Sequence, residues 1–260
     1  MMRICHNLHF IKKPDNSPDE IAFLKNLQKE DSGFRKIVPF SEDNSQAVLV
    51  EHEKYLCIGF RATDEKQDWR DNFNIRKVNH HGGQFHSGFY RSVNLVWRVI
   101  EEAHKELVKK TDKEGVVRPL FITGHSLGGA MATVATARWL LEGDRQFTAT
   151  YTFGQPRAVT KETAKLLDEK CKTKFFRFHN NNDIVPRIPP RVIGYKHVGT
   201  VVYIDKDKAV HPNGLELWNY FKDRVRGIAE SGLGRLDNVR DHPPDDYLDP
   251  IRDWALEETK

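Results

Sequence analysis

The chain has 260 residues, a length that fits one large α/β domain with an ample hydrophobic core. Its 41 lysine and arginine residues nearly balance 37 aspartate and glutamate residues, and no basic block is dense enough to suggest a nucleic-acid groove. We therefore expect no nucleic-acid partner. No stretch approaches the ~20 apolar residues of a membrane span, so we also expect no transmembrane segment. The three cysteines, Cys5, Cys57 and Cys171, cannot all pair with one another, and Cys57 lies in an apolar strand where we expect it to be buried.

The N-terminal sequence, MMRICHNLHFIKKPDN, lacks the continuous apolar core of a signal peptide. We therefore expect a cytoplasmic protein, with secretion after removal of a leader as the alternative. The first forty residues match no motif, and residues 1–46 predict a helix and an arm packed on the core. Ala47–His52 and Lys54–Arg61 predict paired strands joined by a tight turn.

Strands and helices then alternate, as they do in a doubly wound α/β fold. Ser87–Lys110 carries apolar residues at helical spacing and predicts a long amphipathic helix. The strand Phe147–Phe153, the helix Lys161–Cys171 and the strand Val198–Ile204 follow, and Leu215–Ile228 predicts a further helix.

The sequence FITGHSLGGAM places Ser126 at the centre of a G-x-S-x-G pentapeptide. This is the nucleophile-elbow pattern, in which Gly124 and Gly128 leave room for a sharp turn from a strand into a helix. The apolar segment Arg118–Thr123 precedes the turn, and the helix-forming segment Gly129–Leu141 follows it. We therefore predict that Ser126 is a catalytic nucleophile, with helix N-terminal N–H groups available to stabilise developing negative charge.

A serine nucleophile needs a base and an acid that orients the base. Asp183 follows the aromatic strand Phe175–His179, which places its carboxylate at the edge of a parallel sheet where active sites gather. His242 precedes a proline-started helical segment, in a loop from which an imidazole can reach the elbow. The order Ser126, Asp183, His242 along the chain is that of α/β-hydrolases.

Other titratable residues are weaker candidates. His125 is fixed in the elbow and is expected to point away from Ser126, which favours a packing or hydrogen-bonding role. His197, in an apolar strand, is the strongest rival base, although a hydrogen-bonded strand histidine is the favoured interpretation. Asp205 and Asp207 alternate with lysines, which indicates a solvated turn rather than a catalytic acid.

No cluster predicts a metal or a cofactor. His80 and His81 adjoin two glycines, which indicates an exposed loop, and they lack a partner at metal-ligand spacing. His86 is expected to begin a helix near the site in a supporting role. The acidic set Asp241, Asp245, Asp246 and Asp249 fits no calcium loop, so a solvated acidic face is preferred.

Taken together, these segments resemble the class 3 (fungal-type) lipases of the α/β-hydrolase superfamily. The elbow is similar to the family's nucleophile segment, and Asn182–Pro186 with Pro189-Pro190 is similar to its acid loop. The other similar segments are Gly59–Thr63 (oxyanion segment, "FRGT/S"), His86–Phe89 ("HxGF"), Phe153–Arg157 ("(F/Y)GxPR"), Tyr195–Gly199 ("YxHxG") and Asp241–Tyr247 ("DHxxxxY"). The resemblance implies one α/β-hydrolase domain over residues 1–260, with a mostly parallel central sheet and helices on both faces.

The resemblance also implies the chemistry. Ser126, Asp183 and His242 correspond to the family's triad, which cleaves carboxylic esters such as acylglycerols through an acyl-enzyme, as a lipase or carboxylesterase. The oxyanion hole corresponds to the backbone N–H groups of Thr63 and Leu127. Ala62 replaces the family's usual glycine; the change is neutral if φ there is ordinary and costs on the order of 1 kcal/mol if φ is positive.

Substrate choice depends on the lid, which in fungal lipases follows the oxyanion segment. Asp64–Phe73 occupies that place and is mostly charged, with only Trp69 and Phe73 large and apolar. We therefore expect weak interfacial activation, transient contact with a lipid interface, and a preference for short or medium acyl esters. The alternative is that Trp69 and Phe73 are core residues.

Other functions stay open on this scaffold. Phospholipase A1, feruloyl esterase, serine peptidase and acyltransferase activities occur on similar folds. A non-catalytic interaction scaffold is the alternative from a different class, and the intact triad argues against it. The sequence predicts no oligomeric state.

Overall fold

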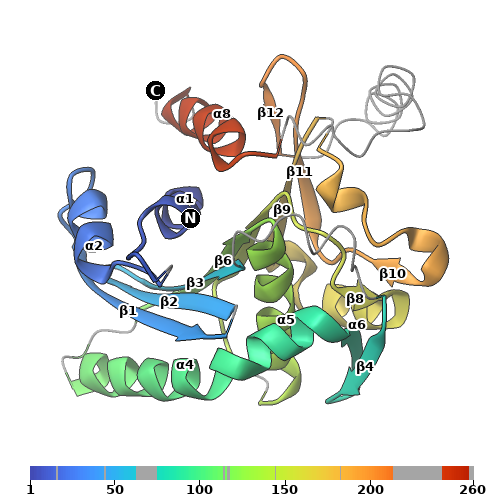
Figure 1. The fold of residues 1–260 in the computed structure, drawn as a ribbon, viewed down its shortest axis with the longest axis horizontal. Helices are drawn as coiled ribbons and strands as arrows, with labels where there is room; N and C mark the ends of the chain where they lie inside the picture. The colour runs from blue at the N-terminus through green and yellow to red at the C-terminus, as the bar shows by residue number, and fades with distance from the viewer. Residues whose placement is uncertain are drawn as a thin grey trace.

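The computed structural model describes residues 1–15, 17–43, 45–62, 75–113, 115, 118–143, 145–181, 183–212 and 242–257. Its centre is an eight-stranded sheet in the order β1-β2-β3-β6-β7-β9-β11-β12 (Figure 1). The strands are β1 Phe34–Glu42, β2 Ser45–His52, β3 Leu56–Ala62, β6 Leu120–His125, β7 Ala149–Phe153, β9 Phe175–Asn180, β11 Thr200–Ile204 and β12 Val210–His211. Neighbours from β3 to β11 run parallel, and the outer pairs are antiparallel. The predicted α/β fold with a mostly parallel sheet is confirmed.

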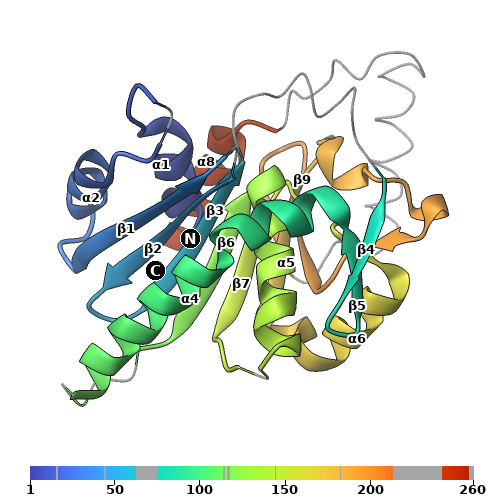
Figure 2. The same cartoon turned by 60° about the horizontal axis from the view of Figure 1, so that its bottom comes forward.

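Helices cover both faces of this sheet (Figures 1 and 2). On one face lie α1 (Met2–Phe10), α2 (Glu20–Gln28) and α8 (Pro244–Glu257), and on the other lie α4 (Ser87–Lys113), α5 (Leu127–Leu141) and α6 (Lys161–Cys171). Side chains of α4, α5 and α6 share one large buried cluster with β2 and β3. Two smaller clusters bury α1 against α2 and against α8. Burial of these apolar faces is the main stabilising contribution to the fold.

The first forty residues contain more secondary structure than the predicted helix and arm. Two helices are followed by β1, a nine-residue strand at the edge of the large sheet. Its burial pattern is irregular and it contains Pro39, so it lacks the clean alternation by which a strand is recognised. Proline lacks the N–H group that a central strand needs, and is tolerated here because β1 has a neighbour on only one side.

A second, four-stranded sheet was not predicted. Its order is β10 (Tyr195–Lys196), β8 (Val159–Thr160), β5 (Gly83–His86) and β4 (Lys77–His80). The predicted exposed loop at His80 and His81 is the turn of the β4–β5 hairpin. The His80 ring stacks on Tyr90 at 4.1 Å between centroids, so this residue is half-buried, whereas His81 is exposed.

The remaining predicted elements agree closely with the structure. The predicted helix at Lys161–Cys171 has the bounds of α6, and α4 continues three residues beyond the predicted Lys110. The segment Leu215–Ile228 lies outside the described residues. All three cysteines are free and buried, and burial raises the pKa of the Cys57 thiol in β3.

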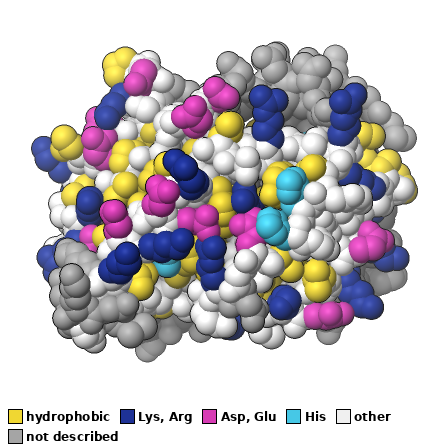
Figure 3. Space-filling model, turned by 90° about the horizontal axis from the view of Figure 1, so that it is seen from below, with side chains coloured by type: hydrophobic (Ala, Val, Ile, Leu, Met, Phe, Trp, Pro, Cys, Tyr) yellow, Lys and Arg dark blue, Asp and Glu magenta, His cyan; other side chains and the backbone are white. Residues whose placement is uncertain are grey.

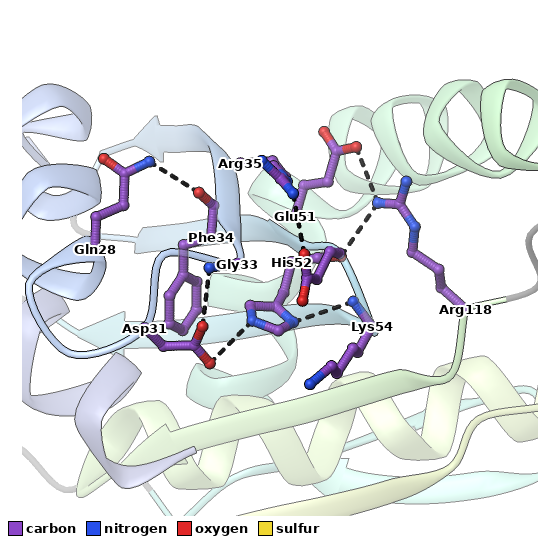
Figure 4. Close-up of polar contacts among 10 residues, drawn as sticks. Gln28, Asp31, Gly33, Phe34, Arg35, Glu51, His52, Lys54 and Arg118 are labelled. Carbon is purple, nitrogen blue, oxygen red and sulfur yellow. Dashed lines mark hydrogen bonds and ion pairs between the residues drawn. The ribbon is translucent and has the colours of Figure 1, made fainter.

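A polar network closes the N-terminal end of β6, opposite the end that leads to Ser126 (Figure 4). Arg118 donates to Glu51 at 2.9 Å and to the backbone carbonyl of His52 at 3.2 Å. His52 accepts the Lys54 N–H at Nδ1 and contacts Asp31 through Nε2 at 3.1 Å. Because Arg118 and Glu51 are both buried, removal of either partner alone is expected to cost about 3–5 kcal/mol of folding free energy.

The face that carries α4 shows basic and acidic side chains interspersed rather than gathered by sign (Figure 3). This agrees with the near balance of charge in the sequence. Among the helices of the described ranges, none combines the length and the apolar character that a membrane crossing requires.

Candidate active site

Ser126 occupies the turn between β6 and α5, at the C-terminal edge of the parallel strands. Its φ of 56° and ψ of −128° are strained for a residue with a side chain. A Cβ atom at Gly124 would lie 2.1 Å from the carbonyl oxygen of Gly128, and one at Gly128 would lie 2.1 Å from that of Phe60. The elbow therefore needs both glycines to turn this sharply against β3.

The structure brings the three residues of the predicted triad together. His242 Nε2 lies 2.7 Å from Ser126 Oγ, and His242 Nδ1 lies 2.8 Å from Asp183 Oδ2. An ionised carboxylate only accepts hydrogen bonds, so Nδ1 carries the imidazole proton and Nε2 faces the serine hydroxyl as an acceptor. Asp183 follows β9 and His242 precedes α8, so loops at one edge of the sheet supply both.

Asp183 is fully buried, and its carboxylate has donors besides His242. Oδ1 accepts the N–H of Val185 at 2.9 Å, and Oδ2 accepts the hydroxyl of Tyr247 at 2.5 Å. The Tyr247 oxygen in turn accepts the N–H of Asn180 at 3.1 Å. Tyr247 therefore ties α8 to the end of β9 and turns one carboxylate oxygen toward His242.

Gly154, at the end of β7, gives the acid and the histidine the space that they occupy. Its φ is +59°, a conformation that glycine adopts without strain. A Cβ atom at this position would lie 2.8 Å from Asp183 Oδ2 and 3.0 Å from His242 Nδ1. Any side chain here would therefore push the acid and the histidine from their positions.

The two residues predicted to form the oxyanion hole differ in what the structure describes. Leu127 is the first residue of α5, where backbone N–H groups have no acceptor within the helix. Thr63 lies outside the described residues. Ala62 ends β3, paired with Ser45, and has the extended backbone of a strand. The alanine in place of the family's usual glycine therefore meets no positive φ.

His125 contacts His242 rather than Ser126. Its Nε2 lies 2.8 Å from the backbone oxygen of His242, which can only accept, so His125 donates. The two imidazole rings lie 4.8 Å apart. The expected hydrogen-bonding role is therefore what the geometry supports, and this contact holds the backbone of the loop that carries His242.

The rival base and acid face other groups. His197 Nε2 lies 2.7 Å from the carbonyl oxygen of Pro186, and its Nδ1 lies 3.4 Å from Gln155 Nε2. Asp205 lies in the turn between β11 and β12, where it contacts His211 at 2.8 Å. Neither side chain is directed at Ser126.

His179 contacts the backbone oxygen of Asp183 through Nε2 at 3.3 Å, whereas the other described histidines and aspartates considered in the sequence have partners elsewhere. His86, which was expected to begin a helix, is instead the last residue of β5. Its ring packs 4.4 Å from that of Phe89, and burial lowers its pKa to about 4. The predicted acidic set is dispersed among partners. Asp245 contacts His6, Asp246 contacts Lys208 and Asp249 contacts Arg252, and Asp241 lies outside the described residues.

With this geometry established, comparison with known proteins decides the family. Residues 57–193, more than half of the chain, match the family model for lipase (class 3). The chain belongs to the class 3 lipase family.

This class 3 lipase is similar in sequence or structure to the following three proteins. It is 33% identical to a secreted mono- and diacylglycerol lipase of Malassezia globosa over 61% of this chain and 51% of the relative. It is 30% identical to a secreted mono- and diacylglycerol lipase of Fusarium solani over 58% of this chain and 44% of the relative. The triacylglyceride lipase of Rhizomucor miehei has the same fold, with a TM-score of 0.69, 21% identity and coverage of 93% and 90% of the two chains. The chain spans about half the length of these two curated relatives.

The predicted cytoplasmic location is contradicted by this comparison. The two curated relatives are named as secreted lipases, which points to an extracellular location. The prediction relied on the composition of the first residues, and these form α1, whose Ile4 and Leu8 are buried against α2 and β3. Their composition reflects packing in the fold and carries no information about export.

Several residues of this class 3 lipase site were not predicted with their roles. Tyr247 and Gly154 stood in family-like segments, but nothing in either segment indicated a contact with Asp183. A glycine directly after a strand is the signal that was available for Gly154. The partners of Tyr247 and His125 lie 64 and 117 residues away in the chain, beyond the reach of any local pattern.

Proposed function

We propose that this class 3 lipase is a serine hydrolase that cleaves carboxylic esters, with acylglycerols as its natural substrates. The observation that carries the proposal is the continuous hydrogen-bonded line from Ser126 Oγ through His242 to the buried Asp183, with distances of 2.7 and 2.8 Å. The strained turn at Ser126 supports it, since strain of this kind gathers at functional sites.

In the proposed mechanism, Ser126 Oγ attacks the ester carbonyl while His242 Nε2 takes the hydroxyl proton. Asp183 holds the Nδ1 proton and stabilises the imidazolium that forms. The backbone N–H groups of Leu127 and Thr63 donate to the oxygen of the tetrahedral intermediate. His242 then gives its proton to the leaving alcohol, and the resulting acyl-enzyme is hydrolysed by water through the same groups in reverse.

The substrate class is proposed from the relatives. Two of them are named as mono- and diacylglycerol lipases, so we propose mono- and diacylglycerols as preferred substrates. The segment Asp64–Phe73 lies outside the described residues. Because its sequence is mostly charged, we still propose short or medium acyl chains and weak interfacial activation.

We expect no abrupt rise in the rate of hydrolysis when the concentration of a short-chain ester passes its solubility limit. A sharp rise would contradict weak interfacial activation.

The test combines turnover with covalent labelling. The wild type should hydrolyse p-nitrophenyl esters, with an optimum between acetate and palmitate that separates esterase from lipase behaviour. An alkyl phosphonate ester should inactivate it with one phosphonyl group per chain, found on the peptide that contains Ser126. A folded wild type that neither turns over any ester nor takes up the label would support an interaction scaffold instead.

Replacement of Tyr247 by phenylalanine tests the support of Asp183. The change removes one donor to the buried carboxylate and the hydroxyl oxygen that accepts the N–H of Asn180. We expect kcat to fall about tenfold and the free energy of unfolding to fall by about 1–3 kcal/mol. Steady-state kinetics and thermal unfolding check the two effects, and an unchanged kcat would show that the other donors suffice to orient Asp183.

A further inference from the structure

The loop that carries Asp183 has little regular structure of its own. Between β9 and β10 it contains the short 3-10 turns Val185–Arg187 and Arg191–Ile193. Several of its carbonyl oxygens point inward to side chains from other elements. Buried carbonyl groups need donors, so the position of this loop depends on the side chains that supply them.

His197 supplies one of these donors. Its Nε2 lies 2.7 Å from the carbonyl oxygen of Pro186, three residues beyond Asp183. That oxygen can only accept, so Nε2 carries the proton and Nδ1 is left as an acceptor. The acceptor faces Gln155 Nε2 at 3.4 Å, and Gln155 Oε1 accepts the Thr133 hydroxyl at 3.0 Å.

In the relay from Thr133 through Gln155 and His197 to Pro186, Gln155 and His197 each donate to the next group, whereas the single proton of the Thr133 hydroxyl is shared between Gln155 Oε1 and a backbone carbonyl. Thr133 lies on α5, the helix that begins next to Ser126, and its hydroxyl also contacts the carbonyl of Gly129. Gln155 is almost fully buried and packs against Gly129. A Cβ atom added at Gly129 would lie 2.8 Å from the Cβ atom of Gln155. The relay therefore joins the helix of the nucleophile to the loop of the acid.

The protonation state of His197 suits this task. Burial, together with the nearby guanidinium groups of Arg177 and Arg157, holds the pKa of His197 well below its usual value. In the neutral ring Nδ1 can accept a hydrogen bond from Gln155. In an imidazolium, the Nδ1–H group would face the NH₂ group of Gln155, and two donors cannot form a hydrogen bond with each other.

Arg157 holds the same loop from another side. Its Nη1 donates to the carbonyl oxygens of Arg187 and Pro189, the latter at 2.6 Å. Three carbonyl groups between residues 186 and 189 are thus held by side chains that belong neither to the loop nor to the triad.

From these contacts we infer that His197, assisted by Arg157, is a positioning residue: it holds the Asp183 loop in register with the Ser126 elbow. The inference rests on the proposed ester hydrolysis, because its effect is on the rate of that reaction. His197 touches neither Ser126 nor His242, so its effect must pass through Asp183. A displacement of about 1 Å at a catalytic group can cost ~10²-fold in rate.

The test uses two substitutions that differ in reach. In His197→Gln the amide N and O lie about as far apart as the two ring nitrogens, so the side chain can donate to Pro186 and accept from Gln155. In His197→Asn the amide keeps a partner for Gln155 but is too short to reach Pro186. We expect His197→Asn to lower kcat for a p-nitrophenyl ester ~10²-fold with little change in KM, and His197→Gln to recover most of the loss.

Two controls separate positioning from general destabilisation. His104 is, like His197, a half-buried histidine whose pKa is lowered, to about 4 by desolvation, but it packs on Trp139 away from the site. His104→Asn should therefore lose stability without losing kcat. In an Asp183→Asn background, His197→Asn should cost almost nothing more, because residues that act as a unit are not additive.

Each outcome decides the question. Equal kcat for wild type and His197→Asn, or a full further loss in the Asp183→Asn background, would overturn the inference. If His197→Asn does not fold, Arg157→Met should show the same fall in kcat and the same lack of additivity with Asp183→Asn, and an unchanged kcat would overturn the inference too. An inactive wild type would instead refute the proposed function, so the two failures are distinguishable.

Discussion

Replacement of Ser126 by alanine should lower kcat for ester hydrolysis by about 10⁶-fold, close to the effect of removing a whole triad. The hydroxyl whose oxygen lies 2.7 Å from His242 Nε2 is then absent, and no acyl-enzyme can form. Alanine keeps the Cβ atom, so the strained turn and the fold should persist. The measurements are steady-state kinetics, phosphonate labelling and thermal unfolding.

Ser126→Gly provides a matched control for this variant. Both substitutions remove the hydroxyl, but only glycine relieves the strain of a φ of 56°. We expect both proteins to be inactive and the glycine variant to be more stable than the alanine variant by about 1 kcal/mol. Activity of Ser126→Ala near the wild-type level would show that Ser126 is not the nucleophile. Another nucleophile would then be needed, and His197 and Asp205 would again be candidates for its base and acid.

The elbow and the order of the triad could be predicted because each depends on a few neighbouring residues. Gly124, Ser126 and Gly128 lie within one turn, and the close contacts of the two glycines with the backbone leave no room for a side chain. Asp183 and His242 could be predicted as acid and base because each stands shortly after a strand or before a helix, a position that the sequence itself marks.

The supporting contacts could not be predicted, since they join residues that only the fold brings together. Tyr247 contacts Asp183 only after α8 has packed on β9. His125 contacts the carbonyl of His242 only when the residues before α8 lie beside the elbow. His197 illustrates the limit well. The sequence indicated a hydrogen-bonded histidine in a strand, but the structure places it directly after β10, and its partner Pro186 became visible only there.

The edge of the sheet was also beyond local patterns. Strand β1 is stabilised by its pairing with β2, in which Pro39 faces Val48, rather than by an alternation of its own residues.

Three expectations stay predictions because they concern residues outside the described ranges. They are the oxyanion role of Thr63, the role of the charged segment Asp64–Phe73 and the helix Leu215–Ile228.

Replacement of Asp183 by asparagine should lower kcat by about 10⁴-fold while the fold persists. The amide has nearly the shape of the carboxylate, so the contacts with Val185 and Tyr247 can be kept in part. It has no charge to stabilise the imidazolium of His242, and its NH₂ group would favour the tautomer with the proton on Nε2. In that tautomer the ring cannot accept the proton of Ser126.

Asp205→Asn is the matched control. Asp205 also accepts from an imidazole, His211, at 2.8 Å and from backbone N–H groups, but it lies in the β11–β12 turn. The same chemical change there should leave kcat unaltered. Because Asp183→Asn acts through His242 and does not touch the ester, KM should change little, and the rate of phosphonate labelling at Ser126 should fall in parallel with kcat. Labelling that stayed fast while turnover fell would mean that Asp183 serves deacylation alone.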